Sequence, residues 1–509
     1  MSKLNEGLTY QYLSANSPPT REERVGVCSA FVGSGSSLKT GMGNGCAKFC
    51  SRKFSQGSGC QLLLALGIVA SLTNVVVIIH SPLGCASSNV GSAGIRKGLR
   101  ASKGKVADEY IWLHTNLDEI DVISGGTEKL KRTILYAEQE YRPEAIIVAN
   151  GCVPGIIGDD IDSVIEDLGK RISTKIVPVH CEGFRSKFVA SGYDSAYHGV
   201  LKKLVDPPHR YEEAIPDEAR AIKEKYKYSK TVNILNVGSN SYGDEVELSR
   251  LVAALGLTPR VLPLHNDVAE LSRISEAALN VSICSTHDDY LVGHLKERFG
   301  TDYILGTLPI GIKNTSRWIR EIAEVFHLEK EAERLIELET ERLEEALAPF
   351  RKVLQGKTVY VGGGETRIFT TGEFFQHLGM KVVGYKPHNF DRFALHFLDD
   401  VESDVVVEVA PGQPAEEINL LNKLRPDLYV GHMGANGWVT KLGISNMPLF
   451  GQSFNYMGYS GAYELARKAA KVIQNTSFVK KISGNVALPF RDTWYEENPF
   501  DNIKNQEAF

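Results

Sequence analysis

Four cysteines stand where α/β proteins place reactive groups, at the ends of predicted strands or the starts of predicted helices. They are Cys60, Cys85, Cys152 and Cys284. The stretch "NVVVIIHSPLGC", which ends at Cys85, passes from a buried-strand pattern into a Pro/Gly turn that delivers a thiol. A single cysteine is more often a small buried hydrophobe than a ligand. Four at such turns favour a metal or redox site.

The spacing of these cysteines indicates which kind of site. It lacks the tight C-x-x-C pairs of a zinc site, whereas widely separated thiolates suit a large iron–sulfur cluster shared between domains or chains. Cys46 and Cys50 lie four residues apart, with Cys28 upstream. These three are either an additional ligand group or incidental residues of an N-terminal arm. Cys181, in "HCEGF", is interpreted as structural.

The elements that must position the cysteines follow a repeated pattern of short apolar strand, Gly-rich turn and amphipathic helix. Strands are predicted at 75–79, 145–148, 175–179, 232–237, 281–284, 359–361, 381–383, 405–409 and 428–430. A long helical run is predicted over 315–354. Strands that alternate with helices predict an α/β fold of doubly wound parallel sheets, whose ligands bind at the carboxyl ends of the strands.

The predicted organisation is an irregular N-terminal arm, three Rossmann-like domains and a C-terminal tail. Their predicted ranges are 1–59, 60–230, 231–350, 351–480 and 481–509. The Gly/Ser-rich arm contains "GSGSSLKT", which resembles a phosphate-binding P-loop. Leu38 occupies the place of a required glycine and no convincing strand is predicted before it, so we reject that motif.

Composition excludes several other classes of function. The net charge of -5 and the dispersed basic residues give no reason to expect nucleic acid as a partner. Residues 60–79 have the length of a membrane span, but Thr73 and Asn74 break them into a helical half and a strand half. No secretory signal is predicted at the N-terminus. A soluble cytoplasmic protein is expected.

Several motifs, in their order along the chain, resemble nitrogenase component 1, its alpha-type chain in particular. They are "IIHSPLGC", "NGCVPGIIGDDIDSVIEDL", "KIVPVHCEGFR", "ICSTHDDYLVGHLKERFGTDYI" and "VYVGGGETRIFTTGEFFQHLGMKVVGYKPHNFDRF", and the likeness continues to "LGISNMPLFGQSFNYMGYSGAY". The resemblance covers about residues 60 to 472 and implies three Rossmann-like domains, as the strand pattern does.

This resemblance implies specific roles for the four cysteines. Cys60, Cys85 and Cys152 match the cysteines that hold one half of an interfacial P-cluster of the 8Fe-7S type, whose other half comes from a homologous beta-type chain in an α2β2 heterotetramer. Cys284 matches the anchor of an 8Fe-9S-C active-site cluster. His80 is either a structural residue at the strand end or a hydrogen-bonding neighbour of the cluster.

The sequence departs from the dinitrogen-reducing pattern near the predicted active site. Its last histidine is His432, so no imidazole follows to bind a heterometal; Asn455, with Gln452 and Ser453, lies in that neighbourhood. A cluster without molybdenum is therefore expected. Tyr193 replaces a proton-donating histidine, and a tyrosine is the weaker acid at neutral pH.

Glu365 stands where these enzymes carry an arginine, whereas Arg367 is retained. The candidate catalytic residues are therefore Tyr193, Glu365, Arg367 and Asn455. Together these changes argue against dinitrogen as the substrate and favour a reshaped pocket.

Two functions remain. The first is an enzyme in which an ATP-dependent, homodimeric iron protein passes electrons through the P-cluster to the cluster on Cys284. Among nitrogenase-like enzymes the chain resembles the catalytic subunit of those that reduce methylthio-alkanes, cleaving a C–S bond of a small-molecule substrate to release methanethiol and a hydrocarbon. The second is a non-catalytic scaffold on which a cofactor precursor matures. Tetrapyrrole reduction fits poorly, because those relatives bind pigment at the Cys284 position.

Overall fold

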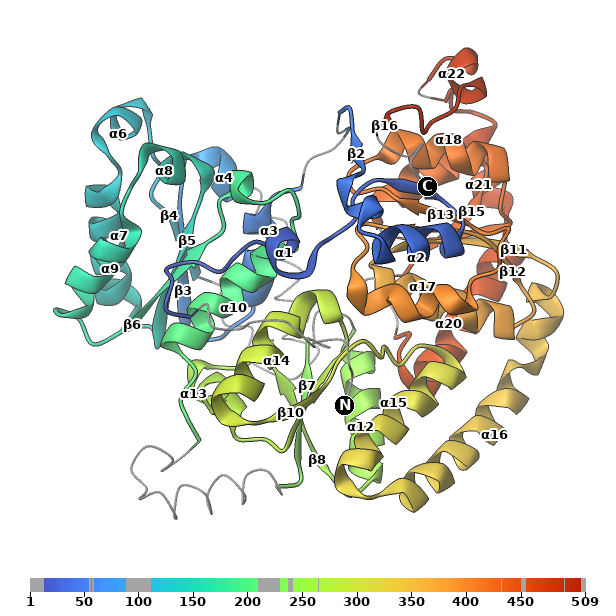
Figure 1. Ribbon diagram of the computed structural model, residues 1–509, viewed down its shortest axis with the longest axis horizontal. Helices are drawn as coiled ribbons and strands as arrows, with labels where there is room; N and C mark the ends of the chain where they lie inside the picture. The colour runs from blue at the N-terminus through green and yellow to red at the C-terminus, as the bar shows by residue number, and fades with distance from the viewer. Residues whose placement is uncertain are drawn as a thin grey trace. The chain divides into compact units, whose positions relative to one another are not determined.

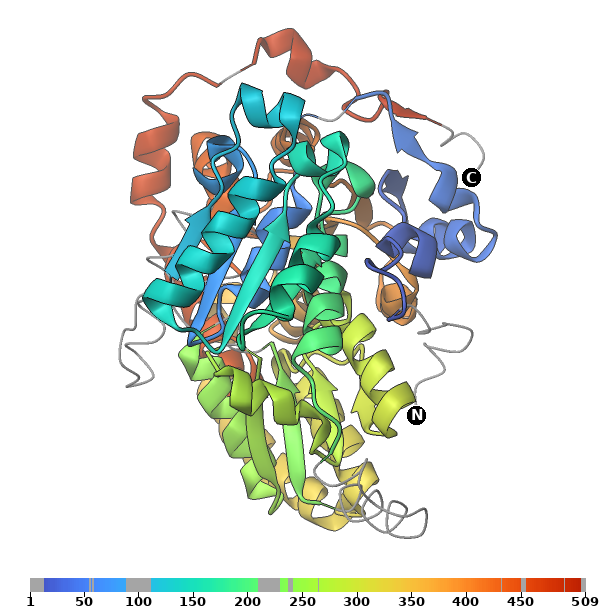
Figure 2. The same ribbon diagram turned by 90° about the vertical axis from the view of Figure 1, so that its left-hand side faces the viewer.

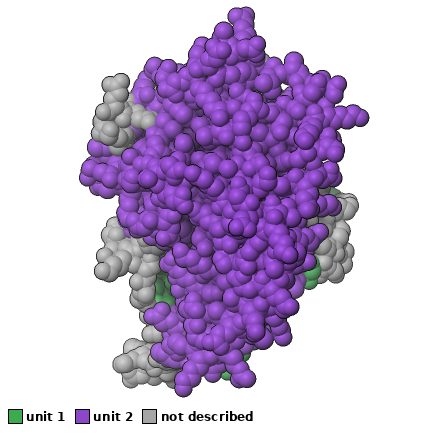
Figure 3. All heavy atoms as spheres, turned by 90° about the vertical axis from the view of Figure 1, so that its right-hand side faces the viewer, with its two compact units in different colours: residues 1–24, 59–242, 256–305 green, residues 25–58, 243–255, 306–509 purple. Residues whose placement is uncertain are grey.

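The computed structural model describes most of the chain, which folds into two compact units (Figure 3). The described residues are 13–54, 56, 59–87, 111–208, 229–236, 241–263, 265–431, 433–449, 455–488 and 490–504. Unit 1 comprises residues 1–24, 59–242 and 256–305, and unit 2 comprises residues 25–58, 243–255 and 306–509. The predicted three-domain boundaries stay a prediction.

The first sheet of unit 1 is parallel throughout and has the order β4-β3-β5-β6. Its strands are β3 (Val75–His80), β4 (Ile111–His114), β5 (Ala145–Asn150) and β6 (Lys175–His180). Every residue of β3 and β5 is buried, as expected of parallel strands covered on both faces. The register pairs His80 with Asn150 and Asn150 with His180, so the three strands end in one row.

Helices cover both faces of this sheet (Figures 1 and 2). On one face lie α7 (Thr127–Tyr141) and α9 (Ile161–Gly169), and on the other lie α3 (Gln61–Val69) and α10 (Ser191–Lys203). Helix α9 buries residues 161, 164, 165 and 168, the one-sided spacing of an amphipathic helix, in the core beneath it.

The second sheet of unit 1 is also parallel, with the order β10-β9-β7-β8. Its strands are β7 (Thr231–Leu235), β8 (Thr258–Leu262), β9 (Leu279–Ser282) and β10 (Asp302–Ile304), joined to helices α13 (Val268–Ser272) and α14 (Ser285–Phe299). The strand predicted over 281–284 therefore ends two residues early. Cys284 is instead the N-cap of α14, with an extended backbone.

Unit 2 is built on a six-stranded sheet with the order β1-β13-β12-β11-β14-β15. Its strands are β1 (Phe31–Gly33), β11 (Thr358–Gly363), β12 (Lys381–Pro387), β13 (Val406–Val409), β14 (Leu428–Gly431) and β15 (Ser445–Pro448), and only β1 pairs antiparallel. Its main helices are α2 (Gly35–Gly43), α12 (Tyr242–Ala254), α15 (Gly311–Phe326), α16 (Glu329–Leu354), α17 (Glu365–His377), α18 (Pro414–Leu424), α19 (Met433–Lys441) and α20 (Gly458–Gln474).

The helical run predicted over 315–354 is two helices, α15 and α16. Helix α15 ends at Phe326 because His327 adopts a left-handed backbone, with φ of 56°.

The Gly/Ser-rich stretch near the N-terminus is more regular than predicted. Strand β1 joins the sheet edge beside β13, and α2 follows at once. The Ser34 hydroxyl accepts the Ser37 N–H and caps this helix, while Leu38 is fully buried. A strand thus does precede "GSGSSLKT", but the motif folds as a helix from Gly35 and not as a phosphate-cradling loop.

The apolar stretch 60–79 forms α3 and β3, two buried elements of unit 1. Within the described residues, no helix combines the length and the apolarity that crossing a membrane requires.

Close packing of α3 against α10 leads to a stability prediction. A Cβ atom at Gly192 would lie 2.2 Å from the Gln61 carbonyl oxygen, so Gly192→Ala must push the two helices apart. We expect it to lower the free energy of unfolding by about 2–3 kcal/mol in urea titrations. Gly67→Ala, in α3 with nothing within 4 Å of the added Cβ, is the matched control. It should be neutral or stabilising by up to about 1 kcal/mol, and equal effects of the two changes would contradict the packing argument.

Candidate functional site

Three of the predicted cluster cysteines converge at one edge of the first sheet, and we call Cys60, Cys85, Cys152 and the facing Gly183 the cysteine cradle. Cys60 is the N-cap of α3, and Cys152 opens α8 (Cys152–Ile157). A Cβ atom at Gly183 would lie 3.3 Å from the Cys152 sulfur and 3.4 Å from the Cys60 sulfur. The backbone N–H of Gly183 donates a hydrogen bond of 3.1 Å to the Cys152 sulfur.

The third cysteine, Cys85, lies in the short helix α4 (Leu83–Ser87) and is half-buried. Burial raises the pKa of its thiol, and the neighbouring Cys152 and Cys60 sulfurs raise it further. Ionising Cys85 beside these sulfurs therefore requires a compensating positive charge, which a bound metal cluster would supply.

Main-chain and side-chain hydrogen bonds hold the turns of the cradle together. The Gly151 N–H donates to the His80 carbonyl oxygen at 3.0 Å, which ties the turn before Cys152 to the turn before Cys85. The Gln61 amide donates to the Glu182 carbonyl oxygen at 3.0 Å, and the Asn150 amide donates to the Glu182 carboxylate at 2.6 Å. The start of α3 is thereby fixed to the turn that carries Gly183.

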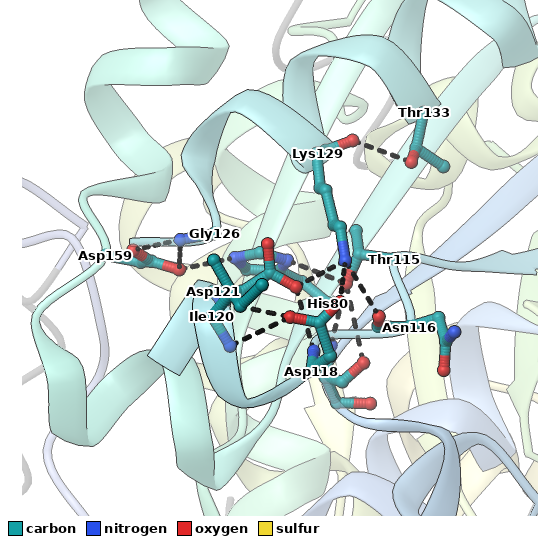
Figure 4. Close-up of polar contacts among 11 residues, drawn as sticks. His80, Thr115, Asn116, Asp118, Ile120, Asp121, Gly126, Lys129, Thr133 and Asp159 are labelled. Atoms are coloured by element: carbon teal, nitrogen blue, oxygen red, sulfur yellow. Dashed lines mark hydrogen bonds and ion pairs between the residues drawn. The ribbon is translucent and has the colours of Figure 1, made fainter. Parts of the chain in front are cut away.

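His80 proves to be a structural residue (Figure 4). Its side chain is fully buried, with Nδ1 3.1 Å from the Thr115 hydroxyl and Nε2 3.1 Å from the Asp159 carboxylate. Burial lowers the pKa of this imidazole, and Asp159 opposes that shift. The same carboxylate accepts the Gly126 N–H, so His80 joins three loops at the strand ends and is committed to the scaffold of the cradle.

The cradle fits one half of a shared iron–sulfur cluster. Its donors are sulfurs, the ligands that such clusters use. The facing residue, Gly183, adds no side chain against the Cys60 and Cys152 sulfurs, and its N–H donates to the Cys152 sulfur. No three His, Cys, Asp or Glu side chains among the described residues are grouped to hold a single metal ion.

The fourth predicted ligand, Cys284, lies at the N-terminus of α14, where the helix dipole favours a thiolate. Its backbone N–H donates to the Ser282 hydroxyl at 3.0 Å, and that hydroxyl donates to the Asp288 carboxylate at 2.7 Å. The other oxygen of Asp288 accepts hydrogen bonds from Tyr197 and Asn236. Burial raises the Asp288 pKa to about 7.

Tyr193 lies on α10 and packs against His287 of α14, with ring centroids 4.2 Å apart. Tyr193, the residue predicted to carry a proton, therefore lies on α10, next to α14, the helix that begins directly after Cys284. Sequence reasoning missed His287. Its spacing of three residues from Cys284, which places two helical side chains on similar faces, was the available signal.

The other three predicted catalytic residues, Glu365, Arg367 and Asn455, belong to unit 2. Glu365 is buried at the start of α17 and accepts the Asp391 N–H at 2.9 Å. Arg367 donates to the Tyr456 hydroxyl and lies over that ring. Asn455 directly precedes Tyr456, so the structure brings Arg367 and Asn455 to the same loop. Glu365 is not part of this group, because its carboxylate binds the Asp391 N–H instead.

Asp244 holds this loop and was not recognised from the sequence. One of its carboxylate oxygens accepts the N–H groups of both Tyr456 and Met457, each at 2.8 Å. In the sequence it is one acidic residue near a helix start, which gives no signal of a distant partner. Gln452 and Ser453 lie outside the described residues. The catalytic roles of Tyr193, Glu365, Arg367 and Asn455 stay predictions.

Three further cysteines, Cys28, Cys50 and Cys181, are buried. Cys181 is fully buried, donates to the Asn150 carbonyl oxygen at 3.4 Å, and has a thiol pKa raised well above its ordinary value by burial. Cys28 pairs through its backbone with Phe390, and Cys50 packs with Ala30 and Ile503. Burial raises the pKa of both thiols, that of Cys28 to about 12. These are the properties of structural cysteines.

Known proteins resemble this chain along most of its length. Residues 60–474 match the family described as Nitrogenase component 1 type Oxidoreductase. A nitrogenase iron-molybdenum cofactor biosynthesis protein NifE from Rippkaea orientalis is 28% identical over 92% of this chain and 95% of its own length. A nitrogenase molybdenum-iron protein alpha chain from Methanosarcina barkeri is 28% identical over 64% of this chain and 60% of its own length.

Among solved structures, nitrogenase Cp1 at pH 6.5 superposes with a TM-score of 0.70 at 20% identity, over 87% of this chain and 93% of that one. This likeness supports the α/β fold with parallel sheets. The family match covers well over half of the chain and includes all four cysteines at the strand ends and helix starts. The chain therefore belongs to the nitrogenase component 1 type oxidoreductase family.

Proposed function

We propose that this chain is the alpha-type subunit of a nitrogenase-like reductase and holds one half of an interfacial iron–sulfur cluster on Cys60, Cys85 and Cys152. The observation that carries the proposal is the convergence of the Cys60 and Cys152 sulfurs on Gly183, with Cys85 close enough that both of them raise the pKa of its thiol. Three thiols are a half-set for a large cluster, so a second chain must supply the rest.

The surface that bears the cradle supports a protein partner. Cys60 is exposed, and apolar side chains on the neighbouring elements are exposed as well. Leu83 is 55% exposed, Ile156 71% and Phe184 56%. Adjacent exposed apolar side chains of this kind mark protein interfaces. We assign this surface to a homologous beta-type chain in an α2β2 assembly.

The second cluster is proposed to be anchored on Cys284 and to lack molybdenum. When bound, it would supply reducing electrons to the substrate. The chain's own residues hold the anchor: the start of α14 favours the thiolate, Ser282 fixes the backbone of Cys284, and Asp288 fixes Ser282. Tyr193 and His287 form a pair of proton-bearing groups on α10 and α14.

The proposed reaction is reductive cleavage of the C–S bond of a methylthio-alkane. Two electrons and two protons convert R–S–CH3 into R–H and CH3SH, and an ATP-dependent iron protein supplies the electrons one at a time. The support is the set of departures at Tyr193, Glu365 and the stretch after His432, which contains no histidine, together with the resemblance to that branch inferred from the sequence motifs.

A second candidate is a scaffold for cofactor maturation. The observation that favours it is the near full-length match to a NifE protein, whose printed name describes cofactor biosynthesis. Identity of 28% does not separate the two candidates, because the chain is equally identical to a nitrogenase alpha chain over a shorter length.

Cysteine variants test the two cluster sites. Cys284→Ala should remove the iron of one cluster and leave the other, since a thiolate ligand is lost at one site only. Cys85→Ala should instead remove the interfacial cluster and weaken the pairing with the beta-type chain. Cys46→Ala, at a half-buried cysteine outside both sites, is the control. The measurements are iron per complex and native mass; full iron in Cys284→Ala would refute the anchor.

Product analysis distinguishes the enzyme from the scaffold. The anoxically purified complex, supplied with its iron protein, ATP and ethyl methyl sulfide, should release ethane and methanethiol in equal amounts over many turnovers. Cys284→Ala should lower this rate at least 100-fold. A cluster-loaded complex that yields no product but restores an apo-nitrogenase would establish the scaffold instead.

A further inference from the structure

A buried set of four charges joins the N-terminal segment of unit 1 to its two functional helices, and we call Arg21, Arg24, Asp194 and Asp289 the arginine clasp. Arg21 Nη1 lies 2.8 Å from one carboxylate oxygen of Asp289, and Arg24 Nη1 lies 2.5 Å from the other. Arg24 Nη2 lies 2.8 Å from a carboxylate oxygen of Asp194. All four side chains are 0% exposed.

The clasp contains two positive and two negative side chains, and its ion pairs require a fixed arrangement of the two arginines. Burial opposes ionisation of Asp289, but Arg21 and Arg24 hold the pKa of this carboxyl below its ordinary value. A guanidinium presents several N–H groups in a fixed plane, and Arg24 uses two of them to bridge two helices. Truncating one partner would leave a buried charge without compensation, which is strongly destabilising.

The clasp residues are direct neighbours of the proposed active-site residues. Asp194 follows Tyr193 on α10. Asp289 follows Asp288, whose carboxylate holds the Ser282 hydroxyl that accepts the Cys284 N–H. A shift of α14 relative to α10 would therefore change both the packing of Tyr193 on His287 and the position of the Cys284 backbone.

We propose that Arg21 and Arg24 are positioning residues that set how α14, and with it Cys284, lies against α10. This inference rests on the proposed function, in which Cys284 holds the active-site cluster. The fully buried side chains of the two arginines act through Asp289 and Asp194, and Arg21 also donates to the Thr286 carbonyl oxygen of α14 at 3.4 Å.

Another contact attaches the same N-terminal segment without involving α14, and it provides a matched control. The Ser17 hydroxyl accepts a hydrogen bond from Arg185 at 2.6 Å. Ser17→Ala therefore weakens the attachment of the segment and leaves the clasp intact.

The first test measures the reactivity of Cys284 in the full-length, cluster-free chain. Iodoacetamide labelling at pH 7.5 is followed by peptide mass spectrometry. Arg24→Lys keeps the charge but cannot bridge both carboxylates, so we expect alkylation of Cys284 to accelerate at least fivefold, with Cys85 unchanged. The charge-balanced Arg24→Gln/Asp194→Asn double variant should behave in the same way, and Ser17→Ala should label as the wild type does. Wild-type labelling of Cys284 in both clasp variants would overturn the proposal.

The second test uses the loaded complex. Arg24→Lys should retain full iron but alter the electron paramagnetic resonance line shape of the cluster on Cys284, and should lower kcat about tenfold with KM within twofold. An unchanged spectrum and kcat would show that the clasp serves stability alone. Failure of the proposed function is distinguishable, because iron in Cys284→Ala would then equal that of the wild type while the labelling result still reports on the clasp.

Discussion

The register of three parallel strands is the constraint on which the cysteine cradle depends. His80, Asn150 and His180 are paired across β3, β5 and β6, so the three strands end in one row. The turns that follow carry Cys85, Cys152 and Gly183 to the same edge. A one-residue slip of any of these strands would move its turn by about 3.3 Å along the strand direction and would separate its residue from the other two. The hydrophobic effect that forms the sheet thereby also positions the thiols.

Hydrogen bonds between polar side chains at the strand ends hold this edge of the sheet in place. His80 joins Thr115 to Asp159, and Asn150 holds the carboxylate of Glu182. These side chains are buried, so each needs its partner. An apolar residue at either position would fill the space but would leave the turns free to move, and a metal cluster requires sulfurs held within a fraction of an ångström.

The sequence allowed the strands, the fold class and the placement of four cysteines at element ends to be predicted, because these depend on local patterns. β3 is a run of β-branched apolar residues between clear turn signals. By contrast, β15 contains Ser, Asn and Pro and lies at a sheet edge, where little apolar character is needed, so it was missed. The Gly/Ser-rich stretch was predicted to be irregular, yet capping by Ser34 and burial of Leu38 make α2 a helix.

The residues that support the sites were harder to predict than the candidate ligands. Asp194 and Asp289 have the appearance of ordinary acidic residues on helices, and their partner Arg24 lies 170 and 265 residues away in sequence. Asp244 reaches across more than 200 residues to the Tyr456 backbone. Such pairs depend on how separate elements pack, and a local pattern carries no record of that packing.

The two proposed cluster sites of unit 1 differ in a way that bears on function. Cys60 of the cradle is exposed and has exposed apolar neighbours, as the proposed pairing with a second chain requires. Cys284 is half-buried, and behind it lie a hydrogen-bonded carboxylate and the arginine clasp. A scaffold must release its cluster, which favours a ligand on a helix or loop that can move. An anchor fixed by four buried charges, as proposed for Cys284, suits a cluster that stays in place through many turnovers, as the proposed enzyme requires.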